Sequence, residues 1–391
     1  MNDRPDVLIV GAGIAGLGLA RALQLAGVPC TVTERAPGLP GLGLGINLPG
    51  NAVRVLADLG VADQVMKAGT PIHRREYRNS AGRLLFEVDE SAFWAGVAPS
   101  VCIRRGDLVR ILAGSLSDDP GHQGVRWDGA VTGLAAHQAA VRVGFARRAR
   151  ESYGFVVGAD GVNSTVRRSV APDAVVHASR MTRSSWRFVV PNPGVEAWTS
   201  WSGAAGTFLL IPLPNGQVYG YAAASRGGGV SADASWLEDT FGRFPAPVRE
   251  AVDSALQHGA LLHQALVQEV DSPRWSYRRM ALIGDAAHAT GPVWAQGAAL
   301  GLEDAVVLAD LLASRSDWSE VGAAYESARR ARVEQVRRAT NRMSRVAALP
   351  AWLRDLIVGH AGPKTYRETY GRLREPYRLR TDDGRPILRV P

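Results

Sequence analysis

Six residues near the N-terminus have the spacing of a phosphate-binding turn. Gly11-Ala12-Gly13-Ile14-Ala15-Gly16 is a GxGxxG pattern between an apolar segment, 6–10, and an Ala- and Leu-rich segment, 14–26. The first glycine allows a tight bend, the second lets backbone approach a pyrophosphate, and the third lets a helix pack on a strand. The helix start then offers unpaired N–H groups to phosphates. We therefore expect Gly11, Gly13, Ala15 and Gly16 to contact a dinucleotide.

An acidic residue stands where such a ligand would need one. Glu34 ends the next predicted strand, 28–33, and is followed by Arg35. A carboxylate about 20 residues after the turn can accept hydrogen bonds from both ribose hydroxyls. GxGxxG alone is a weak signal, and a glycine-rich turn without a ligand is the alternative. The strand, the helix and the acid in register favour a nucleotide, with Glu34 and Arg35 beside it.

Two later segments indicate which dinucleotide binds. Gly158-Ala159-Asp160-Gly161 and Gly284-Asp285-Ala286-Ala287-His288 each follow a buried strand, and Gln296-Gly297 opens a later helix. An aspartate at a strand end can hydrogen-bond a polyol chain, and a helix N-terminus favours negative charge. FAD has both features, a ribityl chain and a flavin ring that becomes negative on reduction, whereas NAD has no comparable anion. The pattern favours FAD.

These motifs require a parallel sheet to position them. Strand, turn, helix and strand at the N-terminus are typical of an α/β, doubly wound, Rossmann-like domain. Residues 71–98 and 175–275 change to alternating, aromatic-rich sequence with turn signals, which predicts a mixed β-sheet substrate domain interleaved with the first. We expect residues 1–70, 99–174 and 276–346 to form the FAD-binding domain, and 347–391 a C-terminal helix and tail.

Taken together, the three motifs resemble those of the single-component flavin monooxygenases related to p-hydroxybenzoate hydroxylase. That family has GxGxxG, GxDGxxSxxR and GDAAHxxxPxxxQG in this order, and the resemblance covers about residues 7–346. It implies an enzyme that uses NAD(P)H and O2 to hydroxylate a small aromatic or polyketide-like molecule through a C4a-hydroperoxyflavin. FAD would be bound non-covalently. No second GxGxxG is present, so NADH or NADPH would dock only transiently.

The resemblance also assigns roles to individual residues. Glu34 resembles the ribose ligand, Arg105 the flavin-contacting arginine, and Asp160 the residue that serves both pyrophosphate and nicotinamide docking. Asp285 resembles the ribityl ligand. Other expected flavin contacts are Gly45, Ile46, Pro292, Gln296, Gly297 and Ala298. Many relatives have GQG where this chain has Ala295-Gln296-Gly297.

Residues for substrate and catalysis are less well defined by the sequence. Arg187, on a predicted strand, is our candidate catalytic residue; it either binds an anionic substrate or pairs with an acid. A flat aromatic pocket facing the flavin is expected from four side chains of the sheet domain and from one between Pro292 and the helix at Gly297: Trp186, Trp201, Phe208, Tyr221 and Trp294. For His288 a packing role is favoured over a covalent flavin link or a general base.

Composition excludes several classes of protein. The net charge of +8 comes from arginines spread along the chain, because only Lys67 and Lys364 are lysines, so a nucleic-acid partner is not expected. Cys30 and Cys102 make neither a disulfide framework nor a metal site. No signal segment or membrane span is predicted, so we expect a cytoplasmic monomer or homodimer acting on a small aromatic substrate with O2.

Alternative functions keep the flavin. Baeyer–Villiger oxidation, epoxidation and reduction of a double bond are not separated from hydroxylation by these residues. Halogenation is disfavoured, because Trp198 and Trp201 lie apart from Ile211-Pro212 and neither lysine is suitably placed. A non-catalytic flavoprotein that sequesters a ligand is the alternative of another class.

Overall fold

A six-stranded sheet carries the three motifs. The computed structural model describes residues 6–41, 43–116, 122–225, 227–258 and 262–378. Every pair in this sheet is parallel except the edge pair β20–β21. In spatial order the strands are β20 (Ser276–Tyr277), β21 (Met280–Leu282), β12 (Phe155–Gly158), β1 (Val7–Val10), β2 (Cys30–Thr33) and β8 (His122–Arg126).

The central strands are short apolar runs because both faces of the sheet are covered. All four residues of β1, β2 and β12 are buried, as expected for a parallel sheet that is covered on both faces. Since the strands are parallel, the residues that follow them meet at one edge: the glycine turn after β1, Glu34 after β2, Asp160 after β12 and Gly284 after β21. This edge is where open α/β sheets bind ligands.

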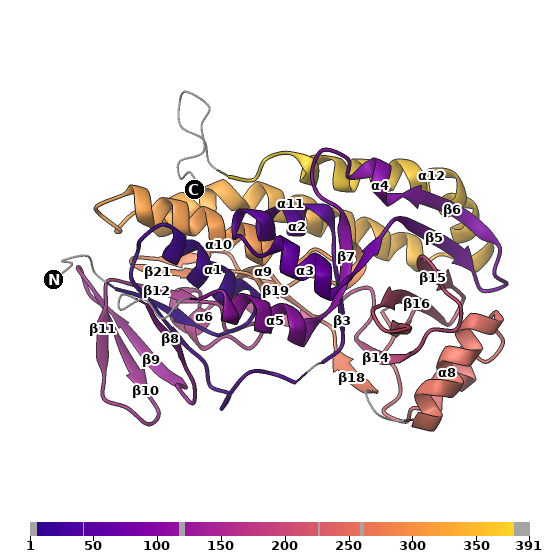
Figure 1. Ribbon diagram of the computed structural model, residues 1–391, viewed down its shortest axis with the longest axis horizontal. Helices are drawn as coiled ribbons and strands as arrows, with labels where there is room; N and C mark the ends of the chain where they lie inside the picture. The colour runs from indigo at the N-terminus through magenta and orange to yellow at the C-terminus, as the bar shows by residue number, and fades with distance from the viewer. Residues whose placement is uncertain (1–5, 42, 117–121, 226, 259–261, 379–391) are drawn as a thin grey trace.

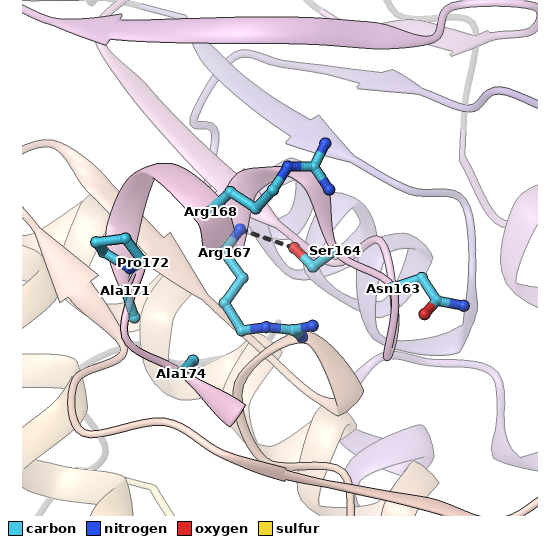
Figure 2. Close-up of a pocket in the computed structure, with 7 residues that line it drawn as sticks. All are labelled: Asn163, Ser164, Arg167, Arg168, Ala171, Pro172 and Ala174. Atoms are coloured by element: carbon cyan, nitrogen blue, oxygen red, sulfur yellow. Dashed lines mark hydrogen bonds between the residues drawn. The ribbon is translucent and has the colours of Figure 1, made fainter. Parts of the chain in front are cut away.

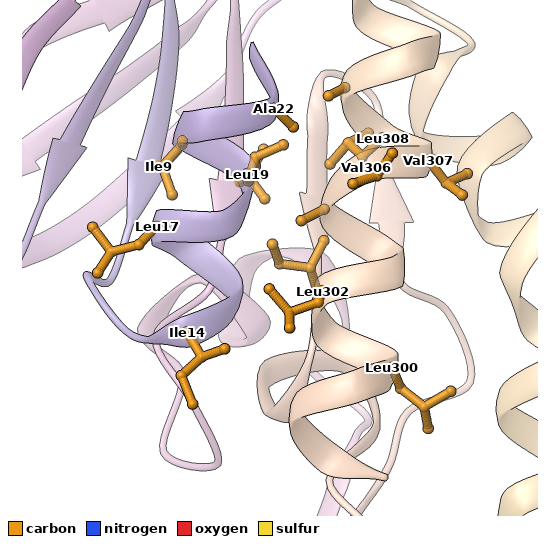
Figure 3. Packing of buried hydrophobic residues seen from close by; sticks show 14 of the residues in the cluster. Ile9, Ile14, Leu17, Leu19, Ala22, Leu300, Leu302, Val306, Val307 and Leu308 are labelled. Carbon is orange, nitrogen blue, oxygen red and sulfur yellow. The ribbon is translucent and has the colours of Figure 1, made fainter. Parts of the chain in front are cut away.

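Two helices from opposite ends of the chain pack together on this sheet. In α1 (Ile14–Leu25) and α10 (Gly297–Ser314), buried apolar side chains such as Leu19 and Leu302 line the contact (Figure 3). Gly18 allows close approach, because an added Cβ would lie 2.8 Å from Leu302 Cδ2. The other helices of this half are α2 (Gly50–Asp58), α3 (Ala62–Ala68), α5 (Arg105–Gly114), α6 (Thr165–Val170), α9 (Asp285–His288), η1 (Pro292–Trp294) and α11 (Val321–Ala347).

A seven-stranded sheet forms the other half of the structure (Figure 1). Its neighbours are antiparallel except for β5 and β15, which pair in parallel. In spatial order the strands are β18 (His263–Leu266), β14 (Ser184–Pro191), β17 (Gln217–Ala224), β16 (Gly206–Leu213), β15 (Trp198–Ser202), β5 (Arg74–Asn79) and β6 (Leu84–Asp89). All come from the segments 71–98 and 175–275; the domain boundaries themselves remain a prediction.

Opposite faces of this sheet have different neighbours. On one face, Phe208 and its neighbours form a core with α7 (Trp236–Phe241) and α8 (Ala246–His258). On the other, Tyr219 and Trp198 pack against a smaller sheet of β3 (Gly45–Leu48), β7 (Ser100–Arg104) and β4 (Thr70–Ile72). We call this second face the site face, because β3 and β7 lead to the expected flavin residues Gly45 and Arg105.

Smaller elements complete the chain. Strands β9 (Val131–Ala136), β10 (Val141–Phe145) and β11 (Glu151–Tyr153) form an antiparallel sheet, and β13 (Val175–Ala178) pairs with β19 (Gln268–Asp271). Helix α4 (Glu90–Phe93) follows β6. Helix α12 (Ala351–Gly371) packs on β6 and leads into η2 (Arg372–Arg374). No helix among the described residues is long and apolar enough to cross a bilayer. The predicted tail lies partly outside them, since 379–391 are not described.

Candidate flavin and substrate site

The glycine turn is built as the sequence predicts. Gly11 has φ +111°, and a Cβ there would lie 2.5 Å from the Ala159 carbonyl oxygen. On Gly16 a Cβ would lie 1.9 Å from the Gly11 carbonyl oxygen, so neither position accepts a side chain. Gly13 differs, because no protein atom lies within 4 Å of a Cβ placed there. The backbone at Gly13 is therefore open to a ligand.

Glu34 lies against this turn. Its Oε2 accepts a hydrogen bond from the Ala12 N–H at 2.9 Å, and its Oε1 accepts one from the Ala36 N–H at 3.0 Å. Each carboxylate oxygen has two lone pairs, so both can still accept from a ribose hydroxyl. Arg35 beside it is exposed. Helix α1 has no side-chain N-cap and no acid in its first turn, which leaves its N-terminus available to phosphate.

The three motifs meet in space through small residues. Besides the contact of Gly11 with Ala159, a Cβ added to either Gly284 or Gly301 would lie 3.1 Å from the Ala15 Cβ. The turns after β1, β12 and β21 and the start of α10 thus approach as close as backbone allows. Asp285 is exposed between buried neighbours, and a Cβ on Gly297 would lie 3.7 Å from its Oδ1.

Asp160 has a structural role within the protein. Its carboxylate accepts hydrogen bonds from Ser164 Oγ at 2.5 Å and from the Thr165 N–H at 2.6 Å, so it holds the N-terminus of α6. Beside it, a cavity of about 270 Å³ is lined by Asn163, Ser164, Arg167, Arg168, Ala171, Pro172 and Ala174 (Figure 2). Two arginines make this cavity cationic.

The turn before α10 is held by side-chain hydrogen bonds to helix α2. Gln296 is buried and exchanges two side-chain hydrogen bonds with Asn51, at 3.0 and 3.2 Å. Ala295 has φ +51°, a left-handed conformation that is unfavourable for a residue with a Cβ. Pro292 and Gly297 are exposed and Ala298 is partly buried. Asn51 was not expected from the sequence, because nothing in its pattern distinguishes it from a helix-core polar residue.

A buried charge network lies behind this turn. His288 Nε2 contacts Asp304 Oδ2 at 2.6 Å, and Arg329 pairs with Asp304 and Glu303 at 2.8 Å each. Although burial raises it, the charges of His288 and Arg329 lower the pKa of Asp304 to about 2. The structure thus places His288 in the core, where its ring also packs against Trp275, with the centroids 4.9 Å apart and the planes tilted by 56°. This geometry agrees with the expected packing role.

The remaining flavin candidates surround the loop after residue 42. Gly45 and Ile46 begin β3 and are partly buried, and a Cβ on Gly45 would lie 2.4 Å from Tyr219. Arg105 is exposed at the start of α5, and its N–H donates to the Leu44 carbonyl at 2.8 Å. The amide of buried Asn47 has no hydrogen-bond partner among the described residues. The backbone of Gly45 and Ile46 and the unpaired amide of Asn47 offer hydrogen-bonding groups that suit the polar edge of a ring system.

Only part of the expected substrate pocket reaches this region. Arg187 and Tyr221 are on the site face, with the guanidinium 5.7 Å from the tyrosine ring centroid, and Trp294 is in η1. Trp186, Trp201 and Phe208 are on the opposite face, in the core with α7 and α8. Strand alternation separates them from the site face, so we leave these three out of the pocket.

An acid partner for Arg187 is not found among the ion pairs of the described residues. Its Nε contacts Ser185 Oγ at 3.3 Å. Burial raises the pKa of Tyr221 to about 12, so this hydroxyl is protonated at neutral pH. No group of three or more metal-ligating side chains occurs in the described part of the chain. The site therefore offers a cation, aromatic rings and hydroxyl groups.

Comparisons with known proteins agree with this geometry. The model of an FAD-binding domain family matches residues 4–340. The chain is 32% identical over 370 residues to 3-amino-4-hydroxybenzoate 2-monooxygenase PtmB3 of Streptomyces platensis, covering 89% of this chain and 90% of that protein. It is 31% identical to the 2-heptyl-3-hydroxy-4(1H)-quinolone synthase of Pseudomonas aeruginosa, with 94% and 97% covered.

A solved structure shares the fold. Klebsiella pneumoniae HpxO, complexed with FAD and uric acid, superposes with a TM-score of 0.78 at 23% identity, covering 95% of this chain and 93% of that one. The chain therefore belongs to the FAD-binding domain family and, within it, to the single-component FAD-dependent aromatic monooxygenases.

Proposed function

We propose that this monooxygenase hydroxylates a flat aromatic ring that carries an anionic group. The overall reaction would convert the ring C–H, O2, NAD(P)H and a proton into the ring C–OH, NAD(P)+ and water. FAD, when bound, supplies the activation of O2. What the chain's own residues do is to bind the cofactor, orient the ring and keep water away from it.

Arg187 carries the proposal for the substrate. It projects from the face of the sheet that packs against β3, beside Tyr221 and without an acidic partner among the described residues. Arg187 lies near enough to Tyr219 to oppose the rise that burial causes in the pKa of that tyrosine. Tyr219 in turn lies against Gly45, one of the expected flavin residues. A guanidinium whose terminal nitrogens are available for hydrogen bonds is suited to bind a carboxylate or a phenolate.

FAD is proposed to span the edge shared by the three motifs. Its pyrophosphate would lie at Gly11, Gly13 and the start of α1, with Glu34 on the ribose and Asp285 on the ribityl chain. The ring would lie between the β3 side, at Gly45 and Ile46, and the segment 292–298. Open space at Gly13 and the lack of a hydrogen-bond partner for Asp285 among the described residues support this placement.

The cationic cavity beside Asp160 is proposed to hold a phosphate of NAD(P)H. Arg168 is exposed there, and its Nη2 makes only a long contact, 3.3 Å, with Thr165 Oγ1. Arg167 donates hydrogen bonds to the Ala286 and Val162 carbonyls. Its side chain lines the cavity (Figure 2). In the Arg168→Gln variant we expect KM for NADPH or NADH to rise about ten-fold with the FAD content unchanged.

The substrate proposal is tested by stimulated NAD(P)H oxidation. 3-Amino-4-hydroxybenzoate, the substrate in the name of one relative, and its uncharged carboxamide serve as the pair of probes. With the native protein the acid should accelerate NAD(P)H oxidation and appear as hydroxylated product. For Arg187→Gln we expect a KM for the acid about 10- to 100-fold higher, with little change for the amide.

One control variant and two outcomes define the result. Arg183→Gln, which changes an exposed arginine one residue before β14, should leave both probes unaffected. If Arg187→Gln changes the acid and the amide equally, Arg187 does not bind an anion. If neither probe is hydroxylated while both accelerate NAD(P)H oxidation, the anionic-aromatic assignment would be replaced by another flavin reaction.

A further inference from the structure

Four buried side chains, two of them from helix α12, form a polar cluster that the proposed chemistry does not use. Arg75 from β5, Glu90 from α4, and Tyr366 and Tyr370 from α12 are 1%, 0%, 1% and 0% exposed. We call them the α12 cluster. The guanidinium lies 5.0 Å from the ring of Trp198, on the site face. Burial of this many polar groups is unfavourable unless their hydrogen bonds are satisfied.

Within the cluster, Glu90 is satisfied without Tyr370. Its Oε1 pairs with Arg75 Nε at 2.6 Å and also accepts from the Tyr366 hydroxyl. Its Oε2 accepts from Ser100 Oγ at 2.5 Å. Glu90 therefore balances the charge of Arg75. Tyr366, one turn before Tyr370, supplies a further hydrogen bond to the Glu90 carboxylate.

Tyr370 instead connects the cluster to the turn at residues 292–296, against which the flavin ring is proposed to lie. Its hydroxyl donates to the Trp294 carbonyl oxygen at 2.6 Å, while Arg75 Nη1 approaches the same hydroxyl at 3.4 Å. The cation favours a hydroxyl hydrogen that points away from it, toward Trp294. The two rings also meet edge to face, with centroids 5.7 Å apart. This bond runs directly from the C-terminal helix to the backbone of η1.

The bonded carbonyl immediately precedes the strained residue of the turn. Ala295 follows Trp294 at φ +51°, and its conformation is unfavourable without external restraint. Asn51 restrains the turn on the far side of Ala295, through Gln296. The Tyr370 hydroxyl restrains it on the near side. The Trp294 Nε1, buried and without a partner among the described residues, shows that this turn also presents an unused donor.

We propose that Tyr370 is a positioning residue that holds the Trp294 peptide, and with it the left-handed Ala295, in the conformation that receives the flavin ring. The C-terminal helix thereby forms part of the cofactor site although it contributes no contact to the cofactor. This inference rests on the proposed placement of the ring against residues 292–298.

The test compares two tyrosines of one cluster. Tyr370→Phe removes the hydroxyl that reaches the turn and keeps the ring; Tyr366→Phe removes the hydroxyl that reaches Glu90. Each purified holoprotein is examined by flavin absorption and fluorescence, by FAD titration, and by the fraction of NAD(P)H oxidation that yields H2O2. Thermal unfolding of both variants measures the loss of stability that each substitution causes in the cluster.

We expect both variants to unfold at lower temperature, but only Tyr370→Phe to change the flavin spectrum and raise the H2O2 fraction. Its FAD dissociation constant should rise about five-fold, the equivalent of one neutral hydrogen bond. Adding Ala295→Gly should return the spectrum toward that of the native protein, because glycine adopts the left-handed conformation without strain. A loss of packing alone would not be rescued in this way.

Three results would overturn the inference. The flavin signals of Tyr370→Phe could equal those of the native protein, those of Tyr366→Phe could shift equally, or Tyr370→Phe could fail to fold with and without Ala295→Gly. A third variant, Trp294→Phe, distinguishes a failure of the positioning role of Tyr370 from a failure of the proposed location of the flavin ring. If Trp294→Phe changes the flavin spectrum and Tyr370→Phe does not, only the positioning role is lost; if neither does, the flavin lies elsewhere.

Discussion

Replacing Asp304 by asparagine tests the charge network behind the turn at residues 292–296. The buried carboxylate accepts hydrogen bonds from the Gly284 N–H at 3.0 Å and from Arg329 Nε at 2.8 Å, and it contacts His288 Nε2 at 2.6 Å. Asparagine has nearly the same shape, but its amide nitrogen must face one of these donors. At least one charge-assisted hydrogen bond is then lost.

Two estimates of the cost agree. A hydrogen bond to a charged group contributes about 1.5–3 kcal/mol. Independently, the pKa of Asp304 is lowered from 3.8 to about 2, and each pKa unit corresponds to about 1.4 kcal/mol, which gives about 2 kcal/mol. Arg329 keeps Glu303 as a partner at 2.8 Å, so the larger penalty of an unpaired buried charge is avoided. We expect Asp304→Asn to lose about 2–3 kcal/mol of unfolding free energy at pH 7.

The direction of this pKa shift determines how the stability difference depends on pH. Because the pKa of Asp304 is lower in the folded state, its stabilisation is present above the unfolded value of 3.8 and is lost as the pH falls toward 2. The difference between native protein and Asp304→Asn should therefore be present at pH 7 and shrink below pH 4. Urea unfolding of the FAD-saturated proteins, followed by tryptophan fluorescence and flavin release, measures it.

A second aspartate on the same helix is the matched control. Asp310 pairs with Arg378 at 2.8 Å, and burial raises its pKa. A raised pKa stabilises the fold only at low pH, and this contribution is lost as the pH rises, so Asp310→Asn should cost little at pH 7. Equal losses for the two variants, or a loss below about 0.5 kcal/mol for Asp304→Asn, would refute the reasoning.

Three further predictions concern the glycine turn, the flavin and the thiols. Gly16→Ala should prevent folding or lower the melting temperature strongly, since its Cβ would lie 1.9 Å from a backbone oxygen, whereas Gly13→Ala should fold normally by circular dichroism yet bind little FAD. Asp285→Asn should weaken FAD about 10- to 100-fold in a fluorescence titration, because a charge-assisted hydrogen bond is lost; unchanged affinity would exclude its ribityl role. Cys30 and Cys102 should react with a thiol reagent only after denaturation, because burial raises the pKa of both thiols, that of Cys30 to about 12; rapid labelling of folded protein would contradict this.

The nucleotide half of the fold could be predicted from the sequence because its signals are local. The glycine spacing after a buried strand, the acid at the end of the next strand and the later GDAAH segment each specify a short piece of backbone. Parallel pairing then brings their ends to one edge, as the contact between Gly11 and Ala159 shows. The family followed from the same residues, and the comparisons confirm it.

The substrate side could not be predicted because both faces of its sheet are apolar. Alternation separates Trp201 from Trp198 and Phe208 from Leu209, but it does not say which set faces the flavin. Which face is turned toward the flavin depends on α7 and α8 covering the other face, and this packing joins segments that are far apart in the sequence. Tyr370 was missed for the same reason, since its partner Trp294 is remote in sequence and is met through a backbone oxygen.

The parallel pairing of β5 with β15 has a consequence for synthesis of the chain. Strand β5 leaves the ribosome with β6 as its only partner and must wait until the whole segment 90–197 has been translated before β15 arrives. Until then, one edge of the β5–β6 hairpin exposes unpaired backbone groups, the type of surface that recruits other chains. Nascent chains stalled before residue 198 should therefore aggregate or bind chaperones more readily than those stalled after β17.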